Sequence, residues 1–547
     1  MKPGRSGPQA AERLPRARGI RQTMSELHSW TGLLAAWILY AMFLTGTTAY
    51  FREEMSQWMR PELPAQKAAP DNAEVAQRVA GELARLAAGS PQWSITLPDA
   101  RSNVVHSFWR KPGGGRRGFE NGVFDPTTGE RLAARETRGG DFFYAFHFNL
   151  HYMPPLWGRW IAGACAMLML LAIVSGVITH KKIFIDFFTF RAGKGQRSWL
   201  DAHNILSVFG LPFHLMITYS GLVTMMIMYM PWGADAAFER SAREGLAAET
   251  TAFIPAGKPS GVAAPLTAVA PLVREAQARW GAAGVGRVIV NHPGDAAARI
   301  VVVRGDAGRV SQSPQYLLFD GRDGRLLQTK VTVGPAAETR GVLYALHLGR
   351  FADTVTRWLY FLVSLAGTAM VGTGLVLWTV KRRARLPDPS RPHLGVTLVE
   401  RLNIVTLAGL SVAMAAFLWG NRLLPTSLAD RAAWEIHLFF AVWAAMALHA
   451  ALRSPRRAWT EQMGLAAALL ALLPVLNAFT TGRPLWRSVL DGDWVFAGME
   501  LTCLALAALH AMFALRAARA VAGATGQRAP RSAAPADRAS ALQSEMA

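Results

Sequence analysis

Histidines are the residues of this chain with the greatest capacity for chemistry inside a membrane. Seven of the thirteen border or enter the first four long apolar segments. They are His28, His147, His151, His180, His203, His214 and His347. A histidine at membrane depth is costly unless it has a partner or a ligand, and imidazole is a common ligand for transition metals. We therefore treat these seven residues as candidate metal ligands.

Depth in the bilayer separates the seven histidines into groups. Three are predicted near the cytoplasmic face, namely His28, His180 and His203. Three are predicted near the outer face, namely His147, His151 and His347. His214 follows His203 by eleven residues, which advance a helix by ~16 Å and return it to within ~20° of the same face. One continuous helix would then present two histidines at two depths, the arrangement that a membrane cytochrome with two haems needs.

The alternative for a histidine at the end of a span is an interfacial role, with its ring among the lipid headgroups. Two features favour ligation. His28 and His203 occupy equivalent places in two halves of the chain, and His214 has no headgroup within reach. His180 lacks such a counterpart, because Trp378 stands at the matching position.

Two further groups of histidines leave alternatives open. His147 and His151 are four residues apart, so a helix would place both on one face. One could then bind a metal while the other lines the substrate side, and the spacing does not choose between them. His437, His449 and His510, in the last spans, fit either a third site or polar contacts between helices.

The apolar blocks that position these residues predict a mainly α-helical membrane protein. Hydrophobic residues make up 51% of the chain and charged residues 17%. Eight segments are long enough to cross ~30 Å of hydrocarbon: 28–51, 156–180, 203–230, 355–380, 399–420, 432–452, 462–481 and 494–516. Lys and Arg gather at alternate ends of these segments, which predicts cytoplasmic termini. The net charge of +21 therefore reflects membrane orientation, and no nucleic-acid partner is expected.

The first 385 residues read as two copies of one unit, in which two spans enclose an outward-facing domain. The outward-facing segments, about 52–150 and 231–350, each show a helical pattern and then strand-like runs. Their turn residues match: Asp125 with Asp320 and Gly129 with Gly324. Within the spans, Thr-Gly or Ser-Gly pairs and Arg-Trp pairs also repeat, at Gly46 and Gly221, Gly176 and Gly374, and Arg159 and Arg357. Functional sites in such repeats tend to lie where the two halves meet.

The repeat predicts five parts of the chain. They are a cytoplasmic basic tail over 1–24, a first repeat over 25–182, a second repeat over 183–385, a four-helix membrane domain over 395–518 and a disordered cytoplasmic tail over 519–547.

These marks resemble the PepSY-associated transmembrane family. The chain carries LHxWxG at 27–32, the Asp-x-x-x-Gly hairpin at 125–129, and Leu-His ahead of Arg-Trp at 150–160 and 346–358. The resemblance covers roughly residues 24–385. It implies a multi-pass protein of the bacterial inner membrane, with two α+β PepSY-like domains in the periplasm and b-type haem between its helices. It further implies redox work similar to that of ferrioxamine-type siderophore reductases.

The predicted function is therefore that of an oxidoreductase, which reduces ferric iron in siderophore chelates at the periplasmic side for iron uptake. Two haem b groups are expected, with the seven histidines as candidate ligands of the haem iron. No nucleotide-binding GxGxxG follows a strand, so the electron donor is predicted to be a quinol or a separate reductase.

Two alternatives belong to other functional classes. One is a PepSY-type membrane-anchored regulator that binds a periplasmic protein partner. The other is a transporter of iron or copper chelates, although the spans lack paired acidic residues for ion coupling.

Overall fold

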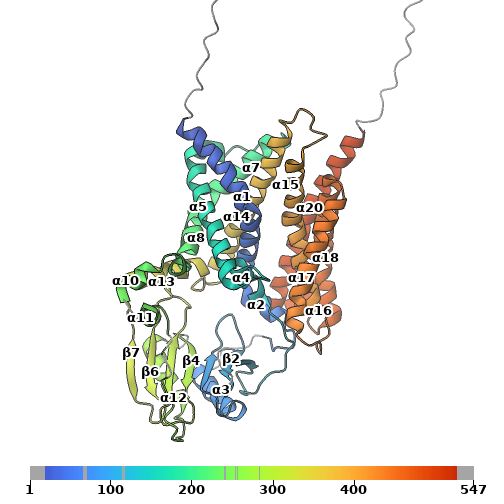
Figure 1. The fold of residues 1–547 in the computed structure, drawn as a ribbon. Coiled ribbons are helices and arrows are strands. Elements are labelled where there is room, and N and C mark those ends of the chain that lie inside the picture. The colour runs from blue at the N-terminus through green and yellow to red at the C-terminus, as the bar shows by residue number, and fades with distance from the viewer. Residues whose placement is uncertain are drawn as a thin grey trace, which may run out of the picture.

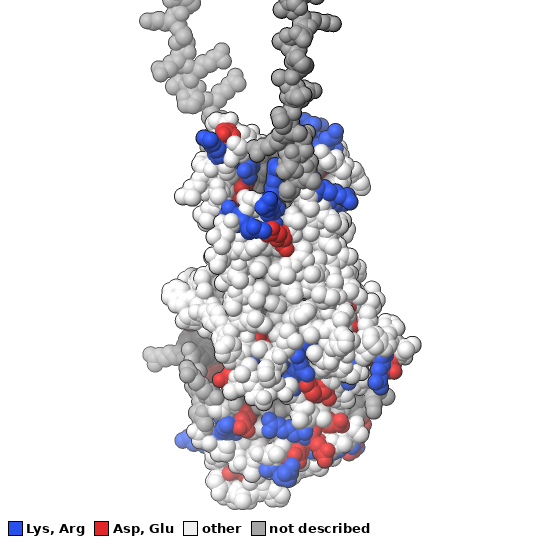
Figure 2. All heavy atoms as spheres, turned by 90° about the vertical axis from the view of Figure 1, so that its right-hand side faces the viewer, with Lys and Arg blue, Asp and Glu red and all other residues white. Residues whose placement is uncertain are grey.

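The computed structural model describes residues 19–526, except 66–70, 114–117, 181, 239–241, 253, 255–256 and 282–283. Long helices form an upright bundle with a sheet at one end, and both described ends of the chain leave from the other end (Figure 1). We call these ends the sheet side and the terminal side. A band almost free of charged residues separates them on the face seen in Figure 2. Such a band is expected where side chains face hydrocarbon.

Seven helical segments in the described residues are long and apolar enough to cross a membrane, and there are up to eight if a bent pair counts as one span. They are α1 (Ile20–Ala49), α5 (Pro155–Thr179), α14 (Thr354–Arg383), α17 (Arg431–Leu452), α18 (Pro455–Thr480), α20 (Trp494–Gly526) and one segment composed of α15 (Leu394–Ile404), a π-helical turn (Val405–Gly409) and α16 (Leu410–Leu423). Proline begins α5 and α18, where its missing N–H needs no partner. The predicted multi-pass helical architecture is confirmed.

The third span departs from the sequence prediction. Two helices, α7 (Gln196–Phe209) and α8 (Leu211–Thr224), replace one continuous span and meet at 68°. The break lies at Gly210, and Pro212 follows in the first turn of α8. Glycine weakens a helix, and proline removes a backbone donor and clashes with the preceding turn. The predicted common face for His203 and His214 was wrong, because it requires a straight helix.

The outward-facing segments form one seven-stranded antiparallel sheet. Its strand order is β3-β2-β1-β4-β5-β6-β7. The strands are β1 (Gln92–Thr96), β2 (Val105–Arg110), β3 (Phe119–Phe124), β4 (Val285–Asn291), β5 (Arg299–Arg304), β6 (Tyr316–Asp320) and β7 (Leu326–Lys330). The first three come from the first segment and the other four from the second. The two segments thus share a sheet instead of standing as separate domains.

A pseudo-two-fold axis passes through the centre of this sheet. At the junction of β1 and β4, Ser94 pairs with Ile289. The offset of the repeat here is 195 positions, so Ile289 is the residue of the second copy that is equivalent to Ser94. A residue that pairs with its own equivalent lies at a two-fold axis. The helices α3 (Asn72–Leu86) and α12 (Val269–Trp280) pack together and close a single core with both halves of the sheet.

The matched turns have the expected chemistry. Asp125 and Asp320 each accept a hydrogen bond from the backbone N–H two residues later, at 2.6 and 2.9 Å. Gly129 and Gly324 have φ values of 79° and 73°, a left-handed conformation that favours glycine. The same local sequence therefore builds the same turn in both copies.

Shorter helices connect the sheet to the bundle. Those at the sheet side are α2 (Arg52–Trp58), α4 (Gly140–Asn149), α9 (Met226–Tyr229), α10 (Trp232–Phe238), α11 (Ala242–Thr250), α13 (Pro335–Leu348) and α19 (Leu485–Leu490), and α6 (Ile183–Phe187) precedes α7 at the terminal side. The C-terminal helices pack against α2 and α4 through buried aromatic residues, among them Trp58, Phe143, Phe146, Phe417 and Phe439. Of the predicted tails, residues 1–18 and 527–547 lie outside the described residues, and α20 extends to Gly526.

Candidate functional site

Four of the seven predicted histidines form two pairs between helices. His28 of α1 faces His203 of α7 near the terminal side, with ring centroids 6.2 Å apart and ring planes inclined at 64°. His147 of α4 faces His347 of α13 near the sheet side, also with centroids 6.2 Å apart, and with planes inclined at 36°. Each pair takes one histidine from each copy of the repeat.

The terminal-side pair is held in a defined tautomer. Nδ1 of His28 lies 2.8 Å from the carbonyl oxygen of Ala172, and Nδ1 of His203 lies 2.9 Å from that of Met370. Ala172 and Met370 are equivalent positions of α5 and α14. Because a carbonyl oxygen only accepts hydrogen bonds, each Nδ1 must donate its proton, which leaves the lone pair of the neutral ring on Nε2.

The sheet-side pair repeats this arrangement on the other helices. Nδ1 of His147 donates to the carbonyl oxygen of Met42 at 2.6 Å, and Nδ1 of His347 donates to that of Ile217 at 3.0 Å. Met42 and Ile217 are again equivalent, in α1 and α8. All four histidines therefore have the same tautomer, with Nε2 available to a ligand.

Each of these rings lies against a glycine of the neighbouring helix. A Cβ atom added to the glycine would approach the ring to 2.8 Å at Gly46 (His147), 3.1 Å at Gly176 (His28), 2.9 Å at Gly221 (His347) and 3.2 Å at Gly374 (His203). These are the glycines of the repeated Thr-Gly and Ser-Gly pairs. Sequence reasoning used them only as markers of the repeat and missed their place in the site. The signal was in their spacing. Gly46 and Gly221 are as far apart in sequence as the carbonyl acceptors Met42 and Ile217, and Gly176 and Gly374 are as far apart as Ala172 and Met370.

The geometry of both pairs fits haem iron. An imidazole nitrogen binds a first-row transition metal at about 2.0–2.1 Å, so two imidazoles on opposite sides of one metal ion have ring centroids roughly 6–6.5 Å apart. The observed separation is 6.2 Å in both pairs. No hydrogen bond to Nε2 of these four rings occurs within the described ranges. All four histidine side chains are partly buried in the protein alone.

The two pairs lie near opposite faces of the bundle. On α1, His28 belongs to one pair and Gly46 contacts the other, and the eighteen residues between them correspond to ~27 Å along a helix. This length is close to the ~30 Å thickness of the hydrocarbon core. The pairs thus mark two sites in line across the membrane.

His214 and His180 lie outside the pairs. His214 is buried between Phe43 and Gly367, next to the bend at Gly210. His180 follows the last turn of α5, where its Nε2 lies 3.1 Å from the carboxylate of Asp186. The structure brings no second histidine opposite either ring within its described part.

His151 is also separated from the pairs. Helix α4 ends at Asn149, and Leu150 takes a φ of 55°, so His147 and His151 do not share a helical face as predicted. The ring of His151 instead stacks on Phe440, with centroids 5.3 Å apart.

The histidines of the last spans make polar contacts. His449 bonds to Glu461 at 2.8 Å, and His437 bonds to the hydroxyl group of Tyr152. The remaining one, His510, bonds to the carbonyl oxygen of Leu506 at 2.8 Å. Two of the three contacts thus join separate helices or segments, and the third lies within α20.

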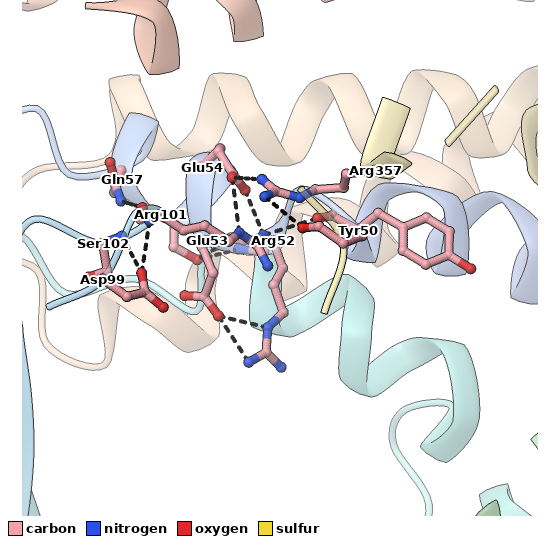
Figure 3. A network of polar contacts seen from close by, with 12 residues as sticks. Tyr50, Arg52, Glu53, Glu54, Gln57, Asp99, Arg101, Ser102 and Arg357 are labelled. Carbon is pink, nitrogen blue, oxygen red and sulfur yellow. Dashed lines mark hydrogen bonds and ion pairs between the residues drawn. The ribbon is translucent and has the colours of Figure 1, made fainter. Parts of the chain in front are cut away.

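A charged network joins the sheet to the bundle at the sheet side. Figure 3 shows the carboxylate of Glu54, on α2, between the guanidinium groups of Arg101 and Arg357. Arg101 donates two hydrogen bonds to it, at 2.8 and 3.1 Å, and Arg357 donates one at 2.5 Å. The equivalent of Arg357 in the first copy, Arg159, bonds to Asn149 instead. One carboxylate thus connects a loop of the sheet with α14.

Comparison with known proteins identifies the family of this chain. The chain is 26% identical over 316 residues to the uncharacterized protein PA4219 of Pseudomonas aeruginosa, a match that covers 54% of this chain and 76% of the relative. The family model described as the PepSY-associated TM region matches residues 25–381. This match includes both histidine pairs and all four glycines, and the chain therefore belongs to the PepSY-associated transmembrane family.

Proposed function

We propose that this protein is a haem-containing electron-transfer protein of the bacterial inner membrane, which reduces ferric iron in siderophore chelates at the periplasmic side for iron uptake. The observation that carries the proposal is the two histidine pairs, each with unpartnered Nε2 atoms within the described residues, at opposite faces of the bundle. A b-type haem held between two imidazoles transfers single electrons and leaves no open coordination position for oxygen.

The surrounding residues have positioning roles in this proposal. His28 and His203 would hold one haem, and His147 and His347 the other. The backbone carbonyl groups that accept from Nδ1 fix the tautomer and orientation of each ring and raise its basicity as a ligand. The four glycines allow each ring to lie close to the neighbouring helix.

The distribution of charge supports the orientation. Lys and Arg gather at the terminal side (Figure 2), which the positive-inside rule places in the cytoplasm. At the sheet side, a cavity is lined within the described residues by seven arginines from both halves of the protein, with six carboxylates among them. The arginines are Arg52, Arg101, Arg287, Arg304, Arg309, Arg350 and Arg357. Burial lowers the pKa of Arg287, and its Nε atom has no partner among the described residues.

Three of these arginines, Arg287, Arg304 and Arg309, form no ion pair with a described carboxylate, and they would attract an anionic ferric chelate. Hard oxygen ligands hold ferric iron tightly, and one electron converts it to ferrous iron, which they hold less well. The cavity thus suits the substrate end of the electron path.

The paired histidines favour this function over the alternatives. A membrane-anchored regulator has no need of equivalent histidines that face each other between helices. A transporter coupled to ions needs accessible carboxylates, whereas Glu435 is fully buried and paired with Arg431 at 2.6 Å.

The visible spectrum of the purified protein tests the proposal. We expect a Soret band, a sharp α band after reduction with dithionite, and two haems per chain. His203→Ala and His347→Ala should each lose one haem, whereas the matched control His180→Ala should keep both. His214→Ala decides whether the enclosed histidine is also a ligand, since loss of a haem would add it to the set. A protein without a Soret band would refute the proposal.

Activity is measured separately from haem binding. The dithionite-reduced protein, freed from excess reductant, should be reoxidised by a ferrioxamine-type chelate, with the ferrous product captured by a chromogenic chelator. Reoxidation by oxygen alone, with no ferrous iron formed, would argue against the substrate class.

A further inference from the structure

A long cavity separates the repeats from the C-terminal helices. Its volume is about 2280 Å³, and its membrane part is lined by one face each of α1, α14, α16, α18 and α20. The arginine-lined region described above is its sheet-side end. Neither histidine pair lies in it, so the membrane part has no role in the site already described.

The membrane part of this cavity has the shape of a slot. One wall is a stripe along α20 with helical spacing: Val495, Met499, Thr502, Leu506, His510, Phe513 and Ala517. The facing wall is a stripe along α14: Phe361, Leu365, Ala369, Thr373, Val376 and Val380. The twenty-two residues from Val495 to Ala517 span ~33 Å, the full thickness of the hydrocarbon core. This slot can take a long apolar chain.

Polar groups occur inside this apolar slot, close to the terminal-side pair. Thr373 lines the slot, and its hydroxyl oxygen lies 3.5 Å from Nδ1 of His203. On the opposite wall, Nδ1 of His510 donates to the carbonyl oxygen of Leu506 at 2.8 Å, so Nε2 of its neutral ring is an acceptor. The slot therefore contains a proton acceptor, His510. On its other wall, Thr373 separates the slot from the proposed haem ligand His203.

We propose that this slot binds an isoprenoid quinol, which is the electron donor of the protein. The inference rests on the proposed function, because it supplies the electrons that ferric reduction consumes. One quinol gives two electrons, transferred singly by way of the terminal-side site, and two protons, which Nε2 of His510 accepts one after the other and passes to water. The quinol becomes quinone, and two ferric ions become ferrous.

The depth of the polar groups favours a quinol over a phospholipid. Thr373 precedes Arg383, at the basic end of α14, by ten residues, which is ~15 Å along the helix. A headgroup beside Thr373 is therefore surrounded by hydrocarbon. Charged groups are expensive at this depth, whereas the uncharged head of a quinol needs only hydrogen bonds.

Quinone bound to the purified protein provides a test that does not depend on haem. Protein from quinone-containing membranes is extracted with solvent, and quinone and phospholipid are quantified per chain. Ala369→Trp fills the slot from α14, and Ala508→Trp is the matched control, since Ala508 is an exposed alanine of α20 outside the slot. We expect about one quinone per chain in the wild type and Ala508→Trp, and at least a tenfold loss in Ala369→Trp. The inference would be overturned if the wild type contained phospholipid but no quinone, and if Ala369→Trp lost that phospholipid.

The second measurement follows electrons. Oxidised protein is mixed without oxygen with decylubiquinol, and the α band is recorded in time. We expect reduction to be at least tenfold slower in Ala369→Trp than in Ala508→Trp, with equal final reduction by dithionite.

His510→Leu keeps the slot open. It should bind quinone but slow the reduction, with a loss of its pH dependence. Haem that dithionite reduces and decylubiquinol does not would refute the quinol site while leaving the proposed function intact. Bound quinone in a protein without haem would refute the proposed function while leaving the quinone site intact.

Discussion

Replacement of Gly46 by alanine should weaken haem binding at the proposed sheet-side site. A Cβ atom at this position would lie 2.8 Å from both Cε1 and Nδ1 of His147. Ordinary non-bonded contacts between such atoms are about 3.5 Å, so the ring would have to move by roughly 0.7 Å. It has little freedom to do so, because its Nδ1 donates to Met42 at 2.6 Å. A displacement of this size exceeds the ~0.5 Å within which a functional site must be held.

The expected loss of haem affinity is larger at the sheet-side site than at the terminal-side site. At Gly374 the corresponding Cβ atom would lie 3.2 Å from His203, which requires a shift of only about 0.3 Å. We therefore expect the affinity for haem to fall by ~10–100-fold in Gly46→Ala, the range for changes in the shell around a metal ligand, and by less in Gly374→Ala. The helices themselves should not suffer, since alanine is favoured over glycine in a helix interior by ~0.5–1 kcal/mol.

The assay is the haem content per chain, measured together with the thermal unfolding temperature in detergent. Gly32→Ala is the matched control, because Gly32 lies on the same helix and a Cβ atom there would have no described neighbour within 4 Å. It should keep both haems. If Gly46→Ala also keeps two haems with an unchanged α band, the ring of His147 does not hold the iron and the argument from glycine contacts fails.

Two further predictions concern the sheet. Glu54→Gln should lower the unfolding temperature, because removal of one partner from a largely buried charge network costs up to ~3–5 kcal/mol and here leaves Arg101 and Arg357 uncompensated. Glu74→Gln, which breaks an exposed ion pair between α3 and Arg274 of α12, should cost less than ~1 kcal/mol, and equal losses would contradict the role of the network. Ile95→Ala, at the centre of the shared core, should cost ~2–5 kcal/mol and weaken hydrogen-exchange protection in both β2 and β5, whereas loss in β2 alone would indicate two independent halves.

Much of the architecture could be predicted from local patterns. The apolar runs predicted the membrane helices, because each run is long enough by itself to span hydrocarbon. The repeat made His28 equivalent to His203 and His147 or His151 equivalent to His347. In a protein with a pseudo-two-fold axis, equivalent residues near that axis face each other, and this is how both pairs arise.

Other features depend on contacts that no local pattern contains. The bend at Gly210 separates His203 from His214, although their spacing suits one helical face. The end of α4 at Asn149 decides between His147 and His151, because the left-handed Leu150 turns the chain away. The pairing of β1 with β4 joins strands almost two hundred residues apart, and neither strand specifies its partner by sequence.

The C-terminal helices break the two-fold symmetry, and this has a consequence for the direction of electron flow. Within the repeats, each pair could be approached equally well through either copy. The slot, however, is lined by α14 and not by its equivalent α5 within the described residues, and Thr373 of α14 lies 3.5 Å from His203. The equivalent of Thr373 on α5 is Ser175, which is 1% exposed and is not among the described residues that line the slot. If the slot holds the donor, electrons enter through the second copy, and the helices outside the family core give the symmetric histidine pair a single point of entry.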